Sequence, residues 1–219
     1  ILKPSSQGTP HLELILGAEK IYKLPLLFLF VMKILTKAEV QLQFEELANK
    51  IKTGQVFIHP TDTIYGISCN ATNETSVKKV RDLKERQENP FSIWAPSIKW
   101  IEKNCVIDQE AKKWLKELPG PYTLILKLKN KKAISKNVNP GPDTIGVRIP
   151  NHWFSRVVEA LGFPIITTSA NKAGKPFMTN LEDLDSEMKM KVDFIIYEGE
   201  KKVRPSKIIN LVKGNIKER

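Results

Sequence analysis

Short apolar segments alternate along this chain with stretches of helical periodicity, and this alternation limits the folds open to it. The apolar segments are bounded by Pro, Gly or polar residues, as buried strands usually are. Strands are predicted over residues 56–58, 91–95, 123–128, 144–149, 164–168, 193–197 and 207–212. Because helical patterns lie between them, the sequence predicts a single α/β domain whose helices pack on a sheet of mostly non-local strands.

Boundary residues support the predicted helices. Thr36 and Glu39 have the spacing of a capping box, and Gly54 would end the helix that they begin. Further helices are predicted over 73–86, from Asp108 to residue 118, and from an Asn151 cap to Gly162.

Length and composition favour one folded domain. Of the 219 residues, 41% are hydrophobic and 27% are charged, the ordinary mixture of a globular protein. The longest apolar run, Leu24 to Val31, is too short to span a bilayer, so no membrane association is expected. We expect residues 1–31 to be an N-terminal extension and residues 32–219 to form the domain proper.

The charge balance indicates anionic partners. Lys and Arg outnumber Asp and Glu by 35 to 24, which gives a net charge of +11. Such a surplus favours nucleotides, nucleic acid or acidic lipid, although Lys-rich stretches such as Lys127 to Lys136 can equally be solvated faces. The two cysteines, Cys69 and Cys105, fit no zinc-ligand spacing, and the histidines are scattered. We therefore expect no metal-ligating site and a reducing, cytoplasmic location.

A hydroxyl-rich loop follows the first of these predicted strands. It contains Thr61, Asp62, Thr63 and Tyr65. Ligands of α/β proteins bind beyond the ends of strands, and hydroxyls there can bind an amino-acid carboxylate or a phosphate oxygen. The alternative is a turn in which Thr and Asp side chains bond to their own backbone.

Other polar residues stand at similar positions. Ser169 and Asn171 follow the predicted strand 164–168, where a hydroxyl and an amide can bind a nucleotide or form an ordinary turn. Lys84 and Arg86 end a predicted helix, where they can bind an anion or merely complement the helix dipole. Arg148 lies within an apolar segment and is costly to bury unless it meets an anion.

The order of these motifs resembles a known family. Along the chain they read Pro-Thr-x-Thr-x-Tyr-Gly, Lys-x-Arg, Asn-Pro, Gly-Pro-x-Thr-Leu-Ile-Leu, Val-Arg-Ile-Pro, Ser-Ala-Asn and a Ser before the last strand. Over about residues 33–219 the chain resembles the threonylcarbamoyl-AMP synthases, which have the YrdC-like fold. The resemblance implies a twisted, mixed open sheet with flanking helices.

The resemblance also implies a reaction. In this family the amine of L-threonine captures bicarbonate or CO2 as a carbamate, which attacks the α-phosphate of ATP. Pyrophosphate leaves, and a downstream threonylcarbamoyl transferase complex uses the resulting adenylate to make N6-threonylcarbamoyladenosine in tRNA. Such chemistry requires positioning and charge neutralisation more than a covalent nucleophile. Mg²⁺ would be carried by ATP and water, since no carboxylate cage is evident.

Site residues follow by matching motif to motif. The family's catalytic signature falls on Lys84, Arg86, Ser169 and Asn171. ATP would contact Arg86, Asn89, Thr144, Asn171, Thr179 and Arg219. Threonine would contact Thr61, Thr63, Tyr65, Arg148, Ser169 and Ser206.

This chain departs from the family pattern at several positions. Asp62 stands where the family usually has Glu, and Trp94 stands where it often has His. The usual Glu-Ser-Thr before the last strand is replaced by Pro205-Ser206-Lys207.

Two other functions are compatible with the sequence. A carbamoyl-adenylate-forming domain of the hydrogenase-maturation type would share the fold, but its Cys clusters have no counterpart here. A module that binds double-stranded RNA or tRNA without catalysis would use the positive charge, although no RNA-binding motif with stacking aromatics is present.

Overall fold

The computed structural model describes residues 13–15, 21–23, 33–141 and 143–217. The chain divides into two compact units, Ile1–Val31 and Met32–Arg219. In the first unit, β1 (Glu13–Ile15) and β2 (Ile21–Lys23) pair in antiparallel fashion. The apolar run Leu24 to Val31 and Arg219, both considered above, lie outside the described residues.

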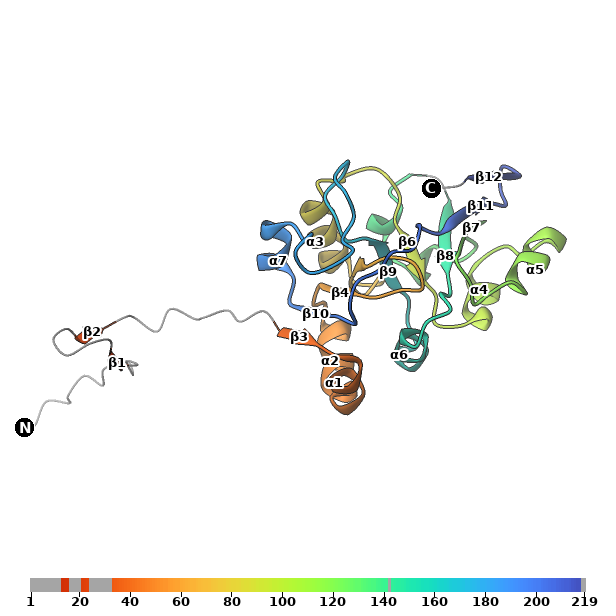
Figure 1. The fold of residues 1–219 in the computed structure, drawn as a ribbon. Helices are drawn as coiled ribbons and strands as arrows, with labels where there is room; N and C mark the ends of the chain where they lie inside the picture. The colour runs from red at the N-terminus through yellow and green to blue at the C-terminus, as the bar shows by residue number, and fades with distance from the viewer. Residues whose placement is uncertain (1–12, 16–20, 24–32, 142, 218–219) are drawn as a thin grey trace, which may run out of the picture. The chain divides into compact units, whose positions relative to one another are not determined.

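The second unit is built on a ten-stranded mixed sheet (Figure 1). Its strand order is β12-β11-β7-β8-β6-β9-β5-β4-β10-β3. The strands are β3 (Lys33–Leu35), β4 (Phe57–His59), β5 (Gly66–Ser68), β6 (Ser92–Trp94), β7 (Tyr122–Lys127), β8 (Thr144–Arg148), β9 (Ile165–Ser169), β10 (Phe194–Ile196), β11 (Lys207–Asn210) and β12 (Asn215–Lys217). The sheet contains both parallel pairs, such as β6 with β8, and antiparallel pairs, such as β7 with β8. The predicted α/β architecture with a mixed open sheet is confirmed.

Seven α-helices are described in the second unit. They are α1 (Lys37–Leu42), α2 (Phe44–Thr53), α3 (Glu74–Lys84), α4 (Ile98–Asn104), α5 (Gln109–Leu115), α6 (Phe154–Leu161) and α7 (Ser186–Lys191). Two short 3-10 helices, Lys131–Ala133 and Lys136–Val138, follow β7. No helix within the described ranges has the length and apolar character needed to cross a membrane.

The predicted helix boundaries hold in part. Thr36 and Glu39 form the capping box, and Gly54 ends α2 with a φ of 105°. The single helix predicted between them is wrong, however, because the chain breaks at Gln43 into α1 and α2. The predicted Asn151 cap is also wrong, because α6 begins at Phe154 and its N-cap residue is Trp153. The backbone N–H of Asn151 instead donates to Asp62 Oδ2.

The helices cover the sheet from both sides. On one side, α1, α2 and α6 enclose an apolar cluster with side chains of β4, β6, β9 and β10, among them Phe57, Trp94 and Phe194. On the other side, α3, α4, α5 and α7 contribute Val77, Ile101, Ala111 and Met188 to a larger cluster, among other residues. Burial of this apolar surface is the main force that fixes the sheet, and it leaves the strand ends and one stretch of sheet face for a site.

Candidate active site

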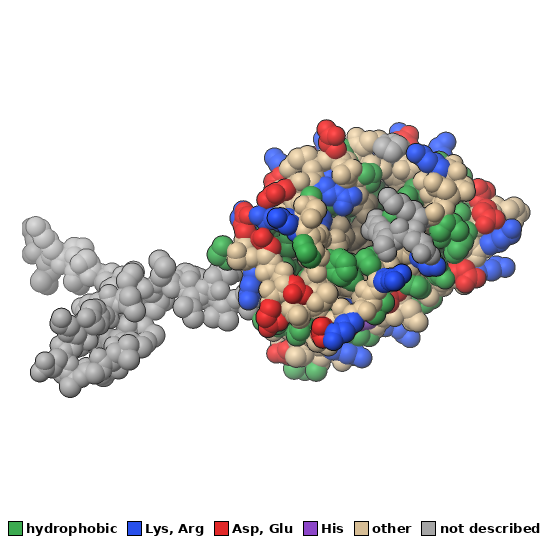
Figure 2. Space-filling view, turned by 45° about the horizontal axis from the view of Figure 1, so that its top comes forward, with side chains coloured by type: hydrophobic (Ala, Val, Ile, Leu, Met, Phe, Trp, Pro, Cys, Tyr) green, Lys and Arg blue, Asp and Glu red, His purple; other side chains and the backbone are tan. Residues whose placement is uncertain are grey.

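A cavity of about 190 Å³ lies over β6, β7, β8 and β11, and we call it the sheet groove. It is lined by Arg86, Pro90, Phe91, Ser92, Thr123, Ile125, Asn139, Thr144, Gly146 and Ile208. Gly146 leaves space at the base of this cavity, because a Cβ at that position would lie only 2.7 Å from Ser92 Oγ. The face of the molecule in Figure 2 is hollowed near its middle, and Lys and Arg side chains are spread around it among Asp and Glu.

Arg86 points to the sheet groove because the chain turns sharply after α3. Glu85 caps the helix in a left-handed conformation, with a φ of 52°, which is uncommon for a residue with a side chain. Arg86 Nη2 then donates to the carbonyl oxygen of Pro90 at 2.7 Å, and the guanidinium lies 5.3 Å from the centre of the Phe91 ring. The structure therefore brings Arg86 and Thr144, both predicted ATP contacts, to one cavity.

Lys84 takes the opposite direction and holds the loop that follows β9. Its Nζ donates to the carbonyl oxygens of Ser169 and Asn171, each at 2.6 Å, and lies 3.4 Å from Asn171 Oδ1. An ammonium group has three protons, so these acceptors account for all of them. Burial, and secondarily the nearby Arg86, lower the pKa of Lys84 to about 7. Lys84 thus joins α3 to the predicted Ser-Ala-Asn motif.

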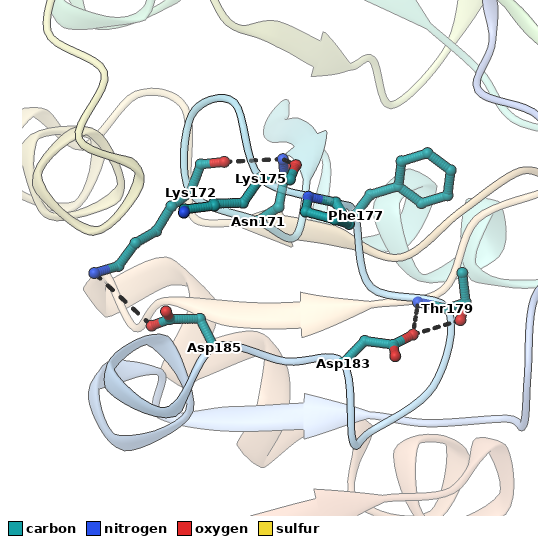
Figure 3. A pocket seen from close by; sticks show the side chains of 8 residues that line it. Asn171, Lys172, Lys175, Phe177, Thr179, Asp183 and Asp185 are labelled. Carbon is teal, nitrogen blue, oxygen red and sulfur yellow. Dashed lines mark hydrogen bonds and ion pairs between the residues drawn. The ribbon is translucent and has the colours of Figure 1, made fainter.

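A second cavity of about 530 Å³, here called the loop pocket, lies beyond that motif (Figure 3). Asn171, Lys172, Lys175, Pro176, Phe177, Thr179, Asp183 and Asp185 line it. Figure 3 shows Asn171, Lys172 and Lys175 on one side and Asp183 and Asp185 on the other. Two predicted ATP contacts, Asn171 and Thr179, therefore share this pocket.

The polar groups of the loop pocket are largely engaged with one another. Asn171 Nδ2 donates to the carbonyl oxygens of Lys172 and Lys175, at 2.9 and 2.6 Å. The Thr179 hydroxyl and its backbone N–H both donate to Asp183. These hydrogen bonds, led by the one from the Thr179 hydroxyl, lower the pKa of Asp183. The turn that was the alternative interpretation of Asn171 is thus present, and it shapes one wall of the cavity.

The loop from residue 60 to residue 65 is both a self-bonded turn and a candidate ligand-binding loop. Thr61 Oγ1 donates to the carbonyl oxygen of Ile64 at 2.7 Å and accepts the backbone N–H of Thr63 at 3.0 Å. The two threonine hydroxyl oxygens lie 3.1 Å apart, and both side chains are buried. The loop is therefore folded by its own hydroxyls, and Thr63 Oγ1 also lies 3.4 Å from Arg148 Nη2.

Arg148 meets the anion that its burial requires. Its Nη2 donates to Asp62 Oδ1 at 2.8 Å, and the two side chains are only 8% and 10% exposed. Leu124 pairs with Val147 across β7 and β8, so Thr123 stands beside Arg148 on one face of the sheet. The predicted threonine contacts Thr61, Thr63 and Arg148 are thereby gathered at one place.

Tyr65 and Ser206 anchor a long segment that joins β10 to β11. The Tyr65 hydroxyl donates to the Gly199 carbonyl oxygen at 2.6 Å and accepts the Glu198 backbone N–H at 3.1 Å. Ser206 Oγ lies 2.9 Å from Thr123 Oγ1 at the other end of the segment. Both hydroxyls are hydrogen-bonded within the chain, and Ser206 is close to the sheet groove through Thr123.

Two predicted residues are not gathered with the others. Asn89 lies in the exposed turn between α3 and β6 and lines neither cavity; its carbonyl oxygen accepts a hydrogen bond from Arg81. Arg219 lies outside the described residues. Ser169, by contrast, ends β9, and Lys84 binds its carbonyl oxygen at the start of the loop that lines the loop pocket.

Sequence reasoning missed several contributors to the site. Ser92 and Thr123 are polar residues within predicted strands, and their alternation with buried apolar neighbours was a usable signal. Glu198 accepts hydrogen bonds from His152 and Trp153 and so ties the segment after β10 to the start of α6. That contact joins residues distant in the sequence, so no local pattern could have revealed it.

A metal site built from side chains is not found among the described residues. No group of three or more His, Cys, Asp or Glu side chains there could hold an ion.

Comparisons with known proteins place the chain in a family. The family model Sua5/yciO/yrdC, described as telomere recombination, matches residues 49–218. A Methanocaldococcus jannaschii protein, to which threonylcarbamoyl-AMP synthase activity is provisionally assigned, is 41% identical over 81% of this chain and 84% of its own length. The Pyrococcus abyssi threonylcarbamoyl-AMP synthase is 32% identical over 71% of this chain, which spans only 46% of that relative.

A solved structure agrees with the sequence comparisons. The structure of P. abyssi Sua5 in complex with L-threonine superposes with a TM-score of 0.75 and 29% identity, covering 85% of this chain and 56% of that one. The matched family model covers most of the domain, including Lys84, Arg86, Arg148 and the loop after β9. This chain belongs to the Sua5/YciO/YrdC family.

Proposed function

We propose that the protein is an L-threonylcarbamoyladenylate synthase, which forms threonylcarbamoyl-AMP and pyrophosphate from L-threonine, bicarbonate and ATP. The observation that carries the proposal is the position of Lys84, whose ammonium binds the loop that contributes Asn171 to the loop pocket, while Arg86, two residues further on, lines the sheet groove. Two ligands can bind next to each other there, as a reaction between a carbamate and a nucleotide requires. The names of the relatives support this assignment.

The amino acid belongs on the sheet-groove side. Arg148 offers a guanidinium to its carboxylate, and Thr61, Thr63 and Ser206 place hydroxyls nearby. Tyr65 shapes this region by holding the segment after β10. The amine would accept CO2 from bicarbonate, and the resulting carbamate would face the nucleotide.

The nucleotide extends from the loop pocket towards Arg86. Asn171 and Thr179 would bind its sugar or base, and Phe177 offers an apolar surface in the same pocket. Arg86 and Thr144, which line the sheet groove, would contact the phosphates, and Asn89 and Arg219 are the remaining ATP contacts that we propose. Arg86 neutralises charge as pyrophosphate departs, which is where a preorganised cation contributes most. Mg²⁺ would bind the phosphates and water.

The product is a reactive mixed anhydride, so a second enzyme must consume it. We assign that step to a threonylcarbamoyl transferase complex acting on tRNA in the cytoplasm. We further propose that residues 32–219 are the catalytic domain and that residues 1–31 are an extension of it.

The decisive experiment follows labelled bicarbonate into product. The protein is incubated with ATP, Mg²⁺ and L-threonine, and a threonine-dependent labelled adenylate is expected together with pyrophosphate. Pyrophosphate release that is unchanged without threonine would overturn the assignment. Product formed from carbamoyl phosphate instead would favour the hydrogenase-maturation type of reaction.

A second function, direct binding of tRNA or double-stranded RNA, is favoured by one observation. Between residues 97 and 136 lysines far outnumber acidic residues, and Lys129, Lys131 and Lys132 are exposed at the end of β7. Each lysine that contacts a phosphate should change the salt-dependence slope of RNA binding by about 1. Replacing these three by Ala should flatten that slope and leave adenylate formation intact, whereas Asn171→Ala should do the reverse. Loss of RNA binding in Asn171→Ala with normal adenylate formation would contradict the assignment of Asn171.

A further inference from the structure

Asp62 makes two of the contacts that attach the 60–65 loop to the strand and turn beside it. Its Oδ1 accepts a hydrogen bond from Arg148 Nη2 at 2.8 Å, and its Oδ2 accepts the backbone N–H of Asn151 at 3.1 Å. Both oxygens of a nearly buried carboxylate are therefore engaged. They join the 60–65 loop to the end of β8 and to the turn that follows it, 86 and 89 positions away in the sequence.

This ion pair is expected to contribute little to the stability of the folded protein. Removing two charges from water costs free energy that their attraction often only offsets, so apolar residues of similar size would hold the loop as well. What the pair does supply is geometry. A guanidinium is a rigid fork on a flexible stem, and an anchored carboxylate restricts the orientations of that fork.

The orientation that results faces polar neighbours. Thr63 Oγ1 lies 3.4 Å from the same Nη2 that binds Asp62. Thr123, beside Arg148 on the sheet, shares a hydrogen bond with Ser206. The guanidinium thus lies beside the Thr63 hydroxyl, and its strand position neighbours the hydrogen-bonded hydroxyls of Thr123 and Ser206, in the region assigned above to the amino acid.

We propose that Asp62 is a positioning residue for the amino-acid substrate, because it holds the Arg148 guanidinium in the orientation that receives the substrate's carboxylate. Asp62 itself touches no reacting atom. The inference rests on the proposed function, since it requires an amino acid at this place. Preorganisation of this kind lowers the entropic cost of binding and raises selectivity for the carboxylate.

The test compares L-threonine with L-threoninamide, in which a neutral amide replaces the carboxylate. For each amino acid, kcat/KM is measured by pyrophosphate release in the wild type and in Asp62→Asn. In Asp62→Asn we expect kcat/KM for L-threonine to fall about tenfold or more, mainly through a higher KM, because one charge-assisted hydrogen bond contributes about that much. For L-threoninamide, kcat/KM should change less than about twofold. A loss that is equal for both substrates would show a purely structural role and overturn the proposal.

Three further variants complete the design. Asp62→Glu keeps the carboxylate and introduces the residue that the family usually has here, so its ratio of the two substrates should lie closer to the wild type than that of Asp62→Asn. If Asp62→Asn does not fold, Asp62→Ala carries the test, and a wild-type ratio in it would overturn the proposal. Asp143→Asn is the matched control, because Asp143 pairs with Lys131 at 2.7 Å on the exposed surface and should leave the ratio unchanged.

The outcome is separable from that of the proposed function. If the wild type makes no threonine-dependent adenylate, the function itself is wrong. If the wild type is active and Asp62→Asn keeps the wild-type preference for the carboxylate, only the role of Asp62 is wrong.

Discussion

Two halves of one sheet face differ in what lies on them. Over β4, β9 and β10 the face bears Phe57, Ile165 and Phe194, and α1, α2 and α6 bury it. Over β7 and β8 the same face bears Thr123, Thr144 and Gly146, and it forms the floor of the sheet groove. Backbone pairing is continuous across both halves.

The difference shows how one sheet supplies both a core and a site. Large apolar side chains require a cover, and a helix provides it. Small and polar side chains need no cover, so a cavity stays open beside them. Because successive strands are hydrogen-bonded to one another, the rigid half also fixes the position of the open half, which catalysis by positioning requires.

The covered half should give the largest stability effect. Phe154 of α6 is fully buried and its ring stacks on His59 at 5.2 Å, so Phe154→Ala should reduce the free energy of unfolding by about 3–5 kcal/mol. Denaturant titration measures this. Leu42→Ala, at a side chain that is 86% exposed on α1, is the control and should change stability by less than about 0.5 kcal/mol. Equal losses would mean that burial on the covered half does not determine the stability of the domain.

The open half should give the largest loss of activity without unfolding. Arg86→Ala removes the cation beside Pro90 and Phe91 and should cost about 2–4 kcal/mol of transition-state stabilisation. Steady-state kinetics on the folded variant measure this cost. Arg156→Ala, at an exposed position of α6, should keep normal turnover. Wild-type turnover in Arg86→Ala would leave only the helix-dipole role, which is worth less than about 1 kcal/mol.

Filling the sheet groove should sharpen the comparison. A Cβ at residue 146 would lie 2.7 Å from Ser92 Oγ and 3.2 Å from Thr123 Cγ2. Overpacking of this size costs about 1–3 kcal/mol, so Gly146→Ala should lower both stability and substrate affinity. Adding Ser92→Ala should restore part of each, as a double-mutant cycle can measure. Additive losses would mean that the two positions do not share the strain.

The pH dependence of stability should report on Lys84, the residue that joins α3 to the loop after β9. Its pKa in the folded protein is about 7, below the ordinary value of 10.5. Between those values the unfolded chain binds more protons, so this group makes the free energy of unfolding rise with pH, by at most about 1.4 kcal/mol per pH unit. Lys84→Met should lack this increment when the two proteins are unfolded at pH 7 to 10. Identical slopes would mean that the ammonium is not destabilised by burial.

The sequence predicted the elements whose signals are local. The capping box at Thr36, the Asp108 cap and the apolar strand that became β9 all depend on neighbouring residues. β5 escaped prediction because Gly66-Ile67-Ser68 has one apolar side chain, and only its place between β4 and β9 buries it. α7 escaped because Ser186–Lys191 is mostly polar and is fixed by contacts of Met188.

The site divides along the same line. Lys84 and Arg86 could be selected from the sequence, but their opposite directions could not, because the left-handed Glu85 between them has no side-chain signature. The anion for Arg148 could be expected on physical grounds, yet its identity as Asp62 depends on a contact across 86 positions in the sequence. The types of residue in the site could therefore be predicted from the sequence, whereas the directions and partners of their side chains could be known only from the fold.

We expect the hydrogen bonds of Lys84 to couple ligand binding at the two cavities. One ammonium joins the end of α3 to the loop after β9, so a ligand that shifts the loop also acts on the turn that aims Arg86. Affinities linked in this way change by the same factor in both directions. If ATP raises the affinity for the amino acid by some factor, the amino acid raises the affinity for ATP by the same factor. Removing the Lys84 contact should reduce that factor towards one.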